Sequence, residues 1–175
     1  MKIHKYEAFG IGIAVALMAT ALFFMRFNDT LTRPAGGNGS SQSASVILAE
    51  GGEAGVVNAL SEAVEGGRVT KVVATDVVIG NGEEVEKGDQ IQIHYIATLQ
   101  NGQEFDNTHK KGESLSLTVG DKSVIEGLNE GVVGMKAGGQ RIIIIPAEKA
   151  YGREGYGPIP GKATVVYAVE LISIK

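Results

Sequence analysis

The chain has 175 residues, of which 43% are hydrophobic and 21% are charged, and its formal net charge is −4 at pH 7. This composition predicts one compact domain with appendages, and the mild negative charge without a basic block argues against nucleic acid as the main partner. The sequence has no cysteine, which excludes disulfides, thiolate catalysis and cysteine-bound metals, while its 25 glycines predict many tight turns between short strands.

The first feature along the chain is an apolar segment near the N-terminus. Residues Ala8–Met25 carry no charge, and as a helix they would span about 27 Å, close to the ~30 Å hydrocarbon core of a bilayer. Because Lys2 and Lys5 precede this segment, we expect residues 1–27 to form a single-pass membrane anchor with the rest of the chain outside the cytoplasm. The alternative is a signal peptide that is cleaved at the small residues of Ala19–Ala21.

Residues 28–67 are predicted to form a flexible linker, because Gly, Ser and other polar residues dominate its first half. Within it, Glu53–Glu65 has a helical stripe of apolar residues, namely Val56, Val57, Leu60, Ala63 and Val64. We therefore expect a short amphipathic helix there. Such a helix could dock on the folded domain, join two chains or stay marginal, since short helices are rarely stable alone.

From residue 68 to residue 175 the pattern changes to short strands. Gln90–Leu99 alternates, which places five of its side chains on one face: Ile91, Ile93, Tyr95, Ala97 and Leu99. Asn101-Gly102 is typical of a type I′ hairpin turn, after which Gln103–Asp106 is predicted to return as the partner strand. Val124–Val133 is the one helical pattern in this region. These patterns predict an antiparallel, strand-dominated domain with a single short helix.

The stretch Ala150–Pro160, AYGREGYGPIP, lies between two strongly apolar strands. Its glycines and prolines are incompatible with a helix interior or a central strand, so it is predicted to be a loop that crosses one end of the sheet. Such a loop would lean Tyr151, Tyr156 and Ile159 over the end of the core. An aromatic rim above an apolar floor is typical of a ligand pocket.

No motif in the sequence predicts a metal, a cofactor or a nucleophile. The three histidines lack the spacing of metal ligands, and the charged run that includes Lys110 and Lys111 is typical of a solvated turn. Gly155–Thr164 is similar to a phosphate-binding loop, but Tyr156 and Ala163 stand where that motif needs glycine and a hydroxyl.

Four blocks between Lys71 and Lys175 occur in an informative order and spacing: HYIATLQNGQEFD at 94–106, VIEGLNEGVVG at 124–134, AYG at 150–152 and ATVVYAVEL at 163–171. Together they resemble the FKBP-type peptidyl-prolyl cis-trans isomerases. The resemblance implies an α+β fold for residues 68–175, in which a curved antiparallel sheet of five to six strands wraps around one short helix.

The resemblance also implies which residues form the site. Catalytic roles would fall on Tyr95, Phe105, Asp106, Ile125 and Tyr151, and substrate-binding roles on Leu115, Val124, Leu128, Tyr156, Ile159 and Tyr167. The Ile125 N–H and the Tyr151 hydroxyl would hold a substrate carbonyl, while Asp106 would act by orientation and electrostatics.

Three positions depart from the commoner family pattern. Leu128 stands in place of a tryptophan, Leu115 in place of a phenylalanine and Ser123 in place of an acidic residue. From the residue pattern alone, ordinary core positions are the favoured interpretation of Phe105, Ile125 and Tyr167, and a turn cap is that of Asp106. Tyr95 and Tyr151 are then equally compatible with site residues and with ordinary strand and loop aromatics.

The sequence therefore predicts a membrane-tethered isomerase that accelerates rotation about X–Pro bonds in a dry apolar pocket and assists protein folding. Its expected partners are proline-containing polypeptides. One alternative is a chaperone-like module that binds proline-containing segments with little turnover. Another is a structural anchor that assembles chains through the Glu53–Glu65 stripe.

Overall fold

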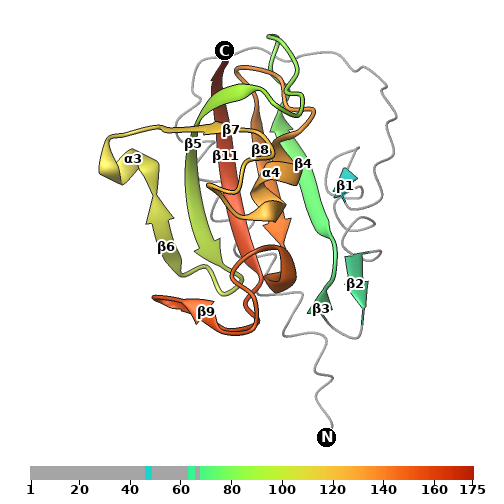
Figure 1. The fold of residues 1–175 in the computed structure, drawn as a ribbon, viewed down its shortest axis with the longest axis vertical. Helices are drawn as coiled ribbons and strands as arrows, with labels where there is room; N and C mark the ends of the chain where they lie inside the picture. The colour runs from blue at the N-terminus through green and yellow to red at the C-terminus, as the bar shows by residue number, and fades with distance from the viewer. Residues whose placement is uncertain (1–45, 49–62, 66–67) are drawn as a thin grey trace, which may run out of the picture.

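The computed structural model describes residues 46–48, 63–65 and 68–175, and a seven-stranded sheet forms the centre of the fold (Figure 1). The strand order is β1-β4-β8-β11-β5-β6, and β7 also pairs with β5. The strands of this sheet are β1 (Val46–Leu48), β4 (Val72–Val78), β5 (Gln90–Leu99), β6 (Glu104–Asn107), β7 (Leu115–Thr118), β8 (Gln140–Ile145) and β11 (Val165–Ile174).

The sheet differs from the prediction in its number of strands and in one pairing direction. It has seven strands, and β1 runs parallel to β4 with Val46 opposite Val72, whereas every other pair in this sheet is antiparallel. Three apolar residues behind a polar stretch are too few for an alternation pattern, so the sequence did not distinguish β1 from the linker.

The predicted membrane anchor at 1–27 lies outside the described residues, as does most of the helix predicted over Glu53–Glu65. The last two residues of that predicted helix, Val64–Glu65, form strand β2, which pairs antiparallel with β3 (Arg68–Val69). Among the residues that the structure describes, no helix has both the length and the apolar character needed to cross a membrane.

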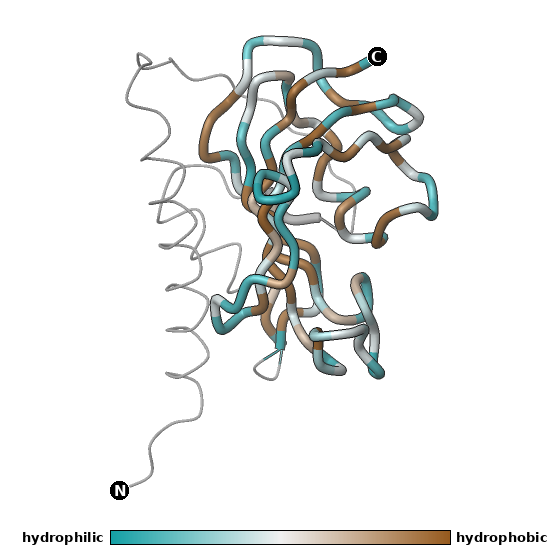
Figure 2. The backbone as a smooth tube through the Cα atoms, turned by 90° about the vertical axis from the view of Figure 1, so that its left-hand side faces the viewer, coloured by the Kyte–Doolittle hydropathy of each residue, from teal (hydrophilic) through white to brown (hydrophobic). Residues whose placement is uncertain are grey.

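Strand β8 is buried along its whole length because it lies between β4 and β11 and is covered on both faces. Ile143 and Ile145 belong to the main core on one face of the sheet, together with the predicted inward face of β5. Ile142 and Ile144 belong to a second apolar cluster, which also contains Val166 of β11. Figure 2 shows hydrophobic segments along the strands and mostly hydrophilic turns at the ends of the domain.

The helix expected from the Val124–Val133 pattern is α4 (Glu126–Val132), which packs against the sheet over β4 and β8 (Figure 1). Its buried face includes two glycines, Gly127 and Gly131. A Cβ atom at Gly131 would overlap the Ile143 side chain, and one at Gly127 would overlap Ile145. The two glycines therefore set the close approach of the helix to the sheet.

Substituting Gly131 with alanine is expected to lower the free energy of unfolding by up to about 2 kcal/mol. Overpacking costs roughly 1–3 kcal/mol, of which alanine offsets ~1 kcal/mol as a better helix former, and the close approach of Ile143 places the cost in the upper part of that range. Urea unfolding of the variant would measure the change. Glu126→Ala, on the exposed side of the same helix, is the control and should change stability by less than about 0.5 kcal/mol. A stabilised Gly131→Ala variant would contradict this account of the contact.

The hairpin between β5 and β6 forms as predicted, but its turn is of a different type. A type I′ turn needs positive φ at both central residues, and of Asn101 and Gly102 only Gly102 has it, with φ of 84°. The Gly102 N–H donates to the Leu99 carbonyl and the Leu99 N–H donates to the Gln103 carbonyl. This is a three-residue loop with a glycine bulge, and the Asn101 side chain supports it by accepting from the Gln103 N–H.

Short elements at the ends of the strands carry the remaining side chains of interest. They are α3 (Thr108–Lys111), which follows β6 directly, the 3-10 helix η1 (Ala147–Lys149), and the small antiparallel pair β9 (Gly155–Tyr156) and β10 (Ile159–Pro160). The predicted loop at Ala150–Pro160 thus contains two short strands, which stiffen the segment that carries the aromatic residues.

Candidate active site

Four aromatic side chains from different parts of the fold meet at one place beside β5 and β11. Tyr95 comes from β5, Phe105 from β6, Tyr151 from the loop after η1, and Tyr167 from β11. We call these four residues the aromatic cluster. β11 pairs with β5 in the register that puts Tyr167 opposite Ala97. Because side chains alternate along each strand, Tyr167 of β11 and Tyr95 of β5 both face the main core.

The rings of the aromatic cluster contact one another edge to face or tilted. The centroids of Tyr95 and Tyr167 are 5.3 Å apart, those of Phe105 and Tyr151 are 6.0 Å apart, and those of Phe105 and Tyr167 are 6.2 Å apart. Tyr156 extends the cluster outward, because its ring stacks on Tyr151 at 6.2 Å while 74% of the residue stays exposed. Such contacts fix ring orientation as well as burying area.

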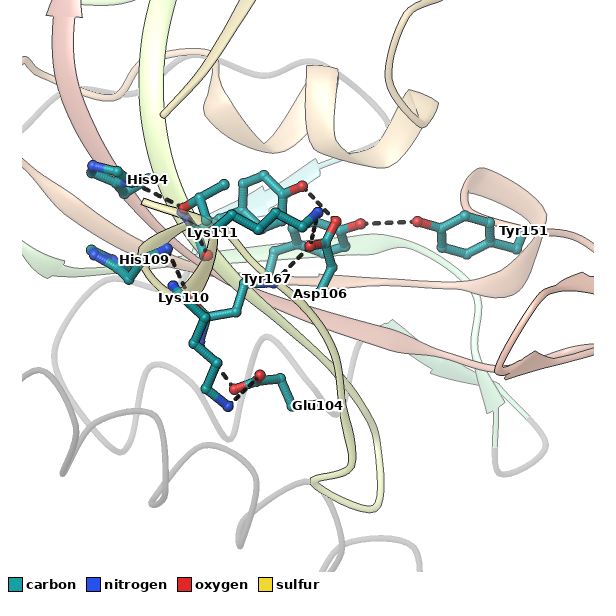
Figure 3. Close-up of polar contacts among 11 residues, drawn as sticks. His94, Glu104, Asp106, His109, Lys110, Lys111, Tyr151 and Tyr167 are labelled. Atoms are coloured by element: carbon teal, nitrogen blue, oxygen red, sulfur yellow. Dashed lines mark hydrogen bonds and ion pairs between the residues drawn. The ribbon is translucent and has the colours of Figure 1, made fainter. Parts of the chain in front are cut away.

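The carboxylate of Asp106 lies beside the rings (Figure 3). The Tyr95 hydroxyl donates a hydrogen bond of 2.8 Å to Asp106, and the Asn107 N–H donates one of 2.7 Å. The Lys111 ammonium group forms an ion pair with the same carboxylate at 2.5 Å. On the other side of the cluster, the hydroxyls of Tyr151 and Tyr167 are 3.1 Å apart and share a hydrogen bond.

The electrostatics of the site keep the carboxylate charged and the phenols neutral. Burial favours a higher pKa for Asp106, but hydrogen bonds from Lys111, Tyr95 and the Asn107 N–H outweigh it and lower the pKa below its ordinary value. Burial, followed by the hydrogen bond to Asp106, raises the pKa of Tyr95 well above the usual range for a phenol. Burial, followed by the hydrogen bond with Tyr151, also raises the pKa of Tyr167 well above the usual range for a phenol.

The other predicted site residues belong to, or pack against, the same main core as the aromatic cluster. Leu128 and Ile159 are buried members of this core, and Leu115, Val124 and Ile125 are partly buried against it. Ile125 has extended backbone at the position before α4, which begins there without a side-chain cap. Two cavities, of about 160 Å³ near Arg68 and about 280 Å³ near Lys87, lie elsewhere and are not lined by the predicted site residues.

The residue that sequence reasoning missed is Lys111. The charged run around it is typical of a solvated turn, and four residues of helix are too few to show a periodicity. Asn107 is the signal that could have pointed to this turn, since its side chain caps α3 by accepting from two backbone N–H groups. The run also brings His109 against His94, with ring centroids 4.4 Å apart.

Comparisons with known proteins agree with this architecture. Residues 81–172 match the family model described as FKBP-type peptidyl-prolyl cis-trans isomerase. An FK506-binding protein of Neisseria meningitidis serogroup B is 40% identical over 104 residues, which are 59% of this chain and 95% of that relative. FK506-binding protein 4 of Gibberella zeae is 43% identical over 107 residues, which are 61% of this chain and 21% of that relative.

A solved structure gives the same result for the fold. The crystal structure of AtFKBP13 aligns with a TM-score of 0.57 and 32% identity, and the alignment covers 62% of this chain and 96% of that chain. The match of a family model to more than half of the residues, together with this likeness in fold, identifies the chain as a member of the FKBP-type peptidyl-prolyl cis-trans isomerase family.

Proposed function

We propose that the chain catalyses rotation about X–Pro bonds at the aromatic cluster, where apolar and aromatic side chains form a dry pocket for the prolyl ring. Tyr95, Phe105 and Tyr167 would form its walls, with Leu128 as its floor. The observation that carries the proposal is the meeting of four aromatic rings, one of which, Tyr95, donates a hydrogen bond to the Asp106 carboxylate, in a chain of this isomerase family.

Such a site needs no acid, base or nucleophile, because no covalent bond is made or broken. Amide resonance opposes rotation with a barrier of roughly 18–20 kcal/mol, and the planar amide is the more dipolar state. Water solvates that planar state better than the twisted one, so a water-poor pocket removes part of its advantage. An acceleration of about a million-fold requires only roughly 8 kcal/mol of preferential stabilisation of the twisted state.

In the proposed site, the hydrogen bonds of the tyrosines determine where each hydroxyl proton points. Tyr95 donates to Asp106, which is therefore fixed as an acceptor. If Tyr167 donates to the Tyr151 oxygen across their 3.1 Å contact, the Tyr151 proton remains for a substrate carbonyl. The Ile125 N–H is the second proposed donor to substrate. Asp106 would then orient Tyr95 and shape the field of the pocket without transferring a proton.

We also propose that the isomerase domain is tethered to a membrane by residues 1–27 and assists the folding of proteins outside the cytoplasm. The support is the uncharged run Ala8–Met25 with basic residues before it. Fractionation of cells, followed by protease treatment of intact spheroplasts, tests this placement. A chain that stays in the soluble fraction, or that resists the external protease until lysis, would rule out the tether or its orientation.

The catalytic proposal is tested by a protease-coupled assay with proline tetrapeptides, on the wild-type chain and Asp106→Val. The wild type should accelerate isomerisation strongly, and Asp106→Val should lower kcat/KM about tenfold, the effect of roughly 1.4 kcal/mol of lost stabilisation. Far-ultraviolet circular dichroism would confirm that the variant is folded. An inactive but folded wild-type chain would refute the proposal.

The binding alternative has a specific observation in its favour, which is the presence of Leu115 and Leu128 where the commoner family members have aromatic residues. Without an aromatic floor the pocket would still hold a prolyl ring but would contact it less closely. NMR exchange spectroscopy separates the two functions. Binding of a prolyl peptide without faster exchange between its isomers would favour the chaperone-like module.

A further inference from the structure

We propose that residues 53–62 pack as a helix on the outer face of the sheet, which is the face turned away from α4. The domain would then have three layers, with the sheet between α4 and this segment. The occupant of the outer face is thus a segment of this same chain, and neither a second copy nor a membrane surface. This packing is independent of the proposed catalysis.

The outer face of the sheet carries an apolar surface of its own. In β8, Ile143 and Ile145 belong to the main core, whereas Ile142 and Ile144 point to the opposite side because side chains alternate along a strand. Val166 of β11 lies with these two isoleucines in the second apolar cluster. The register of β11 and β8 places Val166 opposite Ile144, so the apolar surface continues from one strand to the next.

The outer face is also buried where it extends to β5. Ala168 of β11 lies opposite Ile96 of β5, and alternation puts both side chains on the same side as Val166. Ala168 is 0% exposed and Ile96 is 6% exposed, although neither belongs to an apolar cluster of the described residues. A side chain in the middle of an open sheet face would stay accessible to water. The cover of these two residues therefore comes from outside the described ranges.

The chain is fixed to the domain on both sides of the proposed segment. Before it, β1 pairs with the edge strand β4, with Leu48 opposite Ala74. After it, Ala63 has helical conformation, is buried in the second apolar cluster, and accepts hydrogen bonds from the N–H and the hydroxyl of Thr70, at 2.8 and 3.1 Å. Val64 packs against the same cluster. The connection between β1 and β2 therefore begins at an edge of the sheet and ends on its outer face.

The length of this connection is sufficient to cover the outer face. A helix over residues 53–62 would be about 15 Å long at ~1.5 Å per residue. Neighbouring strands lie roughly 4.8 Å apart, so the axes of β8, β11 and β5 together span about 10 Å. One helix of this length can cross all three strands. Ala49–Gly52, which contains two glycines, remains for the turn that leaves β1.

The side chains of the segment also fit an apolar surface. Val56, Val57 and Leu60 precede Ala63 by one to two helical turns and share its face of a helix. Ala63 already directs this face into the second apolar cluster. Asn58 falls on the opposite face, where it would meet solvent. Because so short a helix is rarely stable alone, contact with the sheet would supply most of its stability.

This packing would have two consequences for the rest of the molecule. It would support β5 and β11, the strands that carry Tyr95 and Tyr167, from the side opposite the aromatic cluster. It would also limit the flexible connection between the proposed anchor and the domain to residues 28–45.

The experiment uses single-cysteine variants of the full 175-residue chain, which has no cysteine of its own. The rate of alkylation by a water-soluble reagent is measured for Leu60→Cys and Asn58→Cys, and each rate is divided by that of the same variant unfolded in urea. Leu60→Cys should react about tenfold more slowly than Asn58→Cys, because its thiol would face the sheet. The ratio should not change when the protein is diluted.

A second substitution locates the surface that protects the thiol. Adding Ile142→Ala to Leu60→Cys should raise its alkylation rate about threefold, because it removes part of the surface under the segment. Adding Ile172→Ala, a truncation at an exposed position of β11, should leave the rate unchanged. Circular dichroism would confirm that each variant is folded. If Leu60→Cys or Ile142→Ala does not fold, Val57→Cys or the milder Ile142→Val takes its place.

Three results would overturn the inference. Equal normalised rates for Leu60→Cys and Asn58→Cys would show that the segment does not dock. Protection that is lost on dilution would mean that a second copy of the chain covers the stripe. Protection that Ile142→Ala leaves unchanged would place the stripe against another surface, such as a membrane. Failure of the proposed catalysis is separate from all three, because none of these measurements depends on isomerase activity.

Discussion

Replacing Arg141 with methionine is expected to lower the free energy of unfolding by about 3 kcal/mol. The guanidinium group is 2% exposed and makes two bonds to the Asp76 carboxylate, at 2.7 and 2.9 Å. It also donates to the carbonyls of Gly131 and Val133, at 3.0 and 2.8 Å, where α4 ends without a basic residue of its own. Methionine would fill the space but leave these carbonyls without a donor.

The expected loss lies at the lower end of the range for broken buried ion pairs, because the Asp76 side chain is 33% exposed and can be solvated once its partner is gone. Urea unfolding followed by circular dichroism would measure the change. Arg153→Met is the control, since Arg153 is exposed in the loop before β9 and should change stability by less than about 0.5 kcal/mol. A loss below about 1 kcal/mol for Arg141→Met would mean that this pair behaves like one at the surface.

Truncating Phe105 to alanine is expected to lower kcat/KM about a hundredfold, which corresponds to roughly 2.7 kcal/mol. The Phe105 ring contacts Tyr151 and Tyr167 edge to face, at 6.0 and 6.2 Å between centroids. Its removal would take away a wall of the proposed pocket and two contacts of about 0.5–1.5 kcal/mol each that orient the tyrosines.

The prolyl peptide assay measures this effect, with urea unfolding to separate activity from stability. Phe105→Leu keeps most of the apolar volume and should retain more activity than Phe105→Ala. Ile172→Ala is the matched truncation outside the site, on the exposed side of β11, and should leave kcat/KM unchanged. Equal activity of Phe105→Ala and the wild-type chain would remove Phe105 from the site.

Patterns that repeat along the chain predicted the corresponding elements. The alternation over Gln90–Leu99 correctly identified the inward face of β5, and the stripe that begins at Val124 identified α4 to within two residues. The contacts among Tyr95, Tyr151 and Tyr167 depend on strand register and loop geometry. For that reason they could be anticipated only from the family resemblance.

Features that depend on tertiary contacts were not predictable from the pattern. Arg141 directly precedes a run of four isoleucines, and its carboxylate partner lies 65 residues away in the sequence. Lys111 resembles any solvated lysine until the caps of α3 place it beside Asp106.

The position of β11 has a consequence for biosynthesis. This strand lies between β5 and β8, yet it follows both of them along the chain, so the two halves of the sheet have no common partner until residues 165–174 have emerged. Pairings between segments so distant in sequence form slowly, because the entropy of closing long loops must be overcome first. This chain can therefore complete its central sheet only after translation has passed its last central strand.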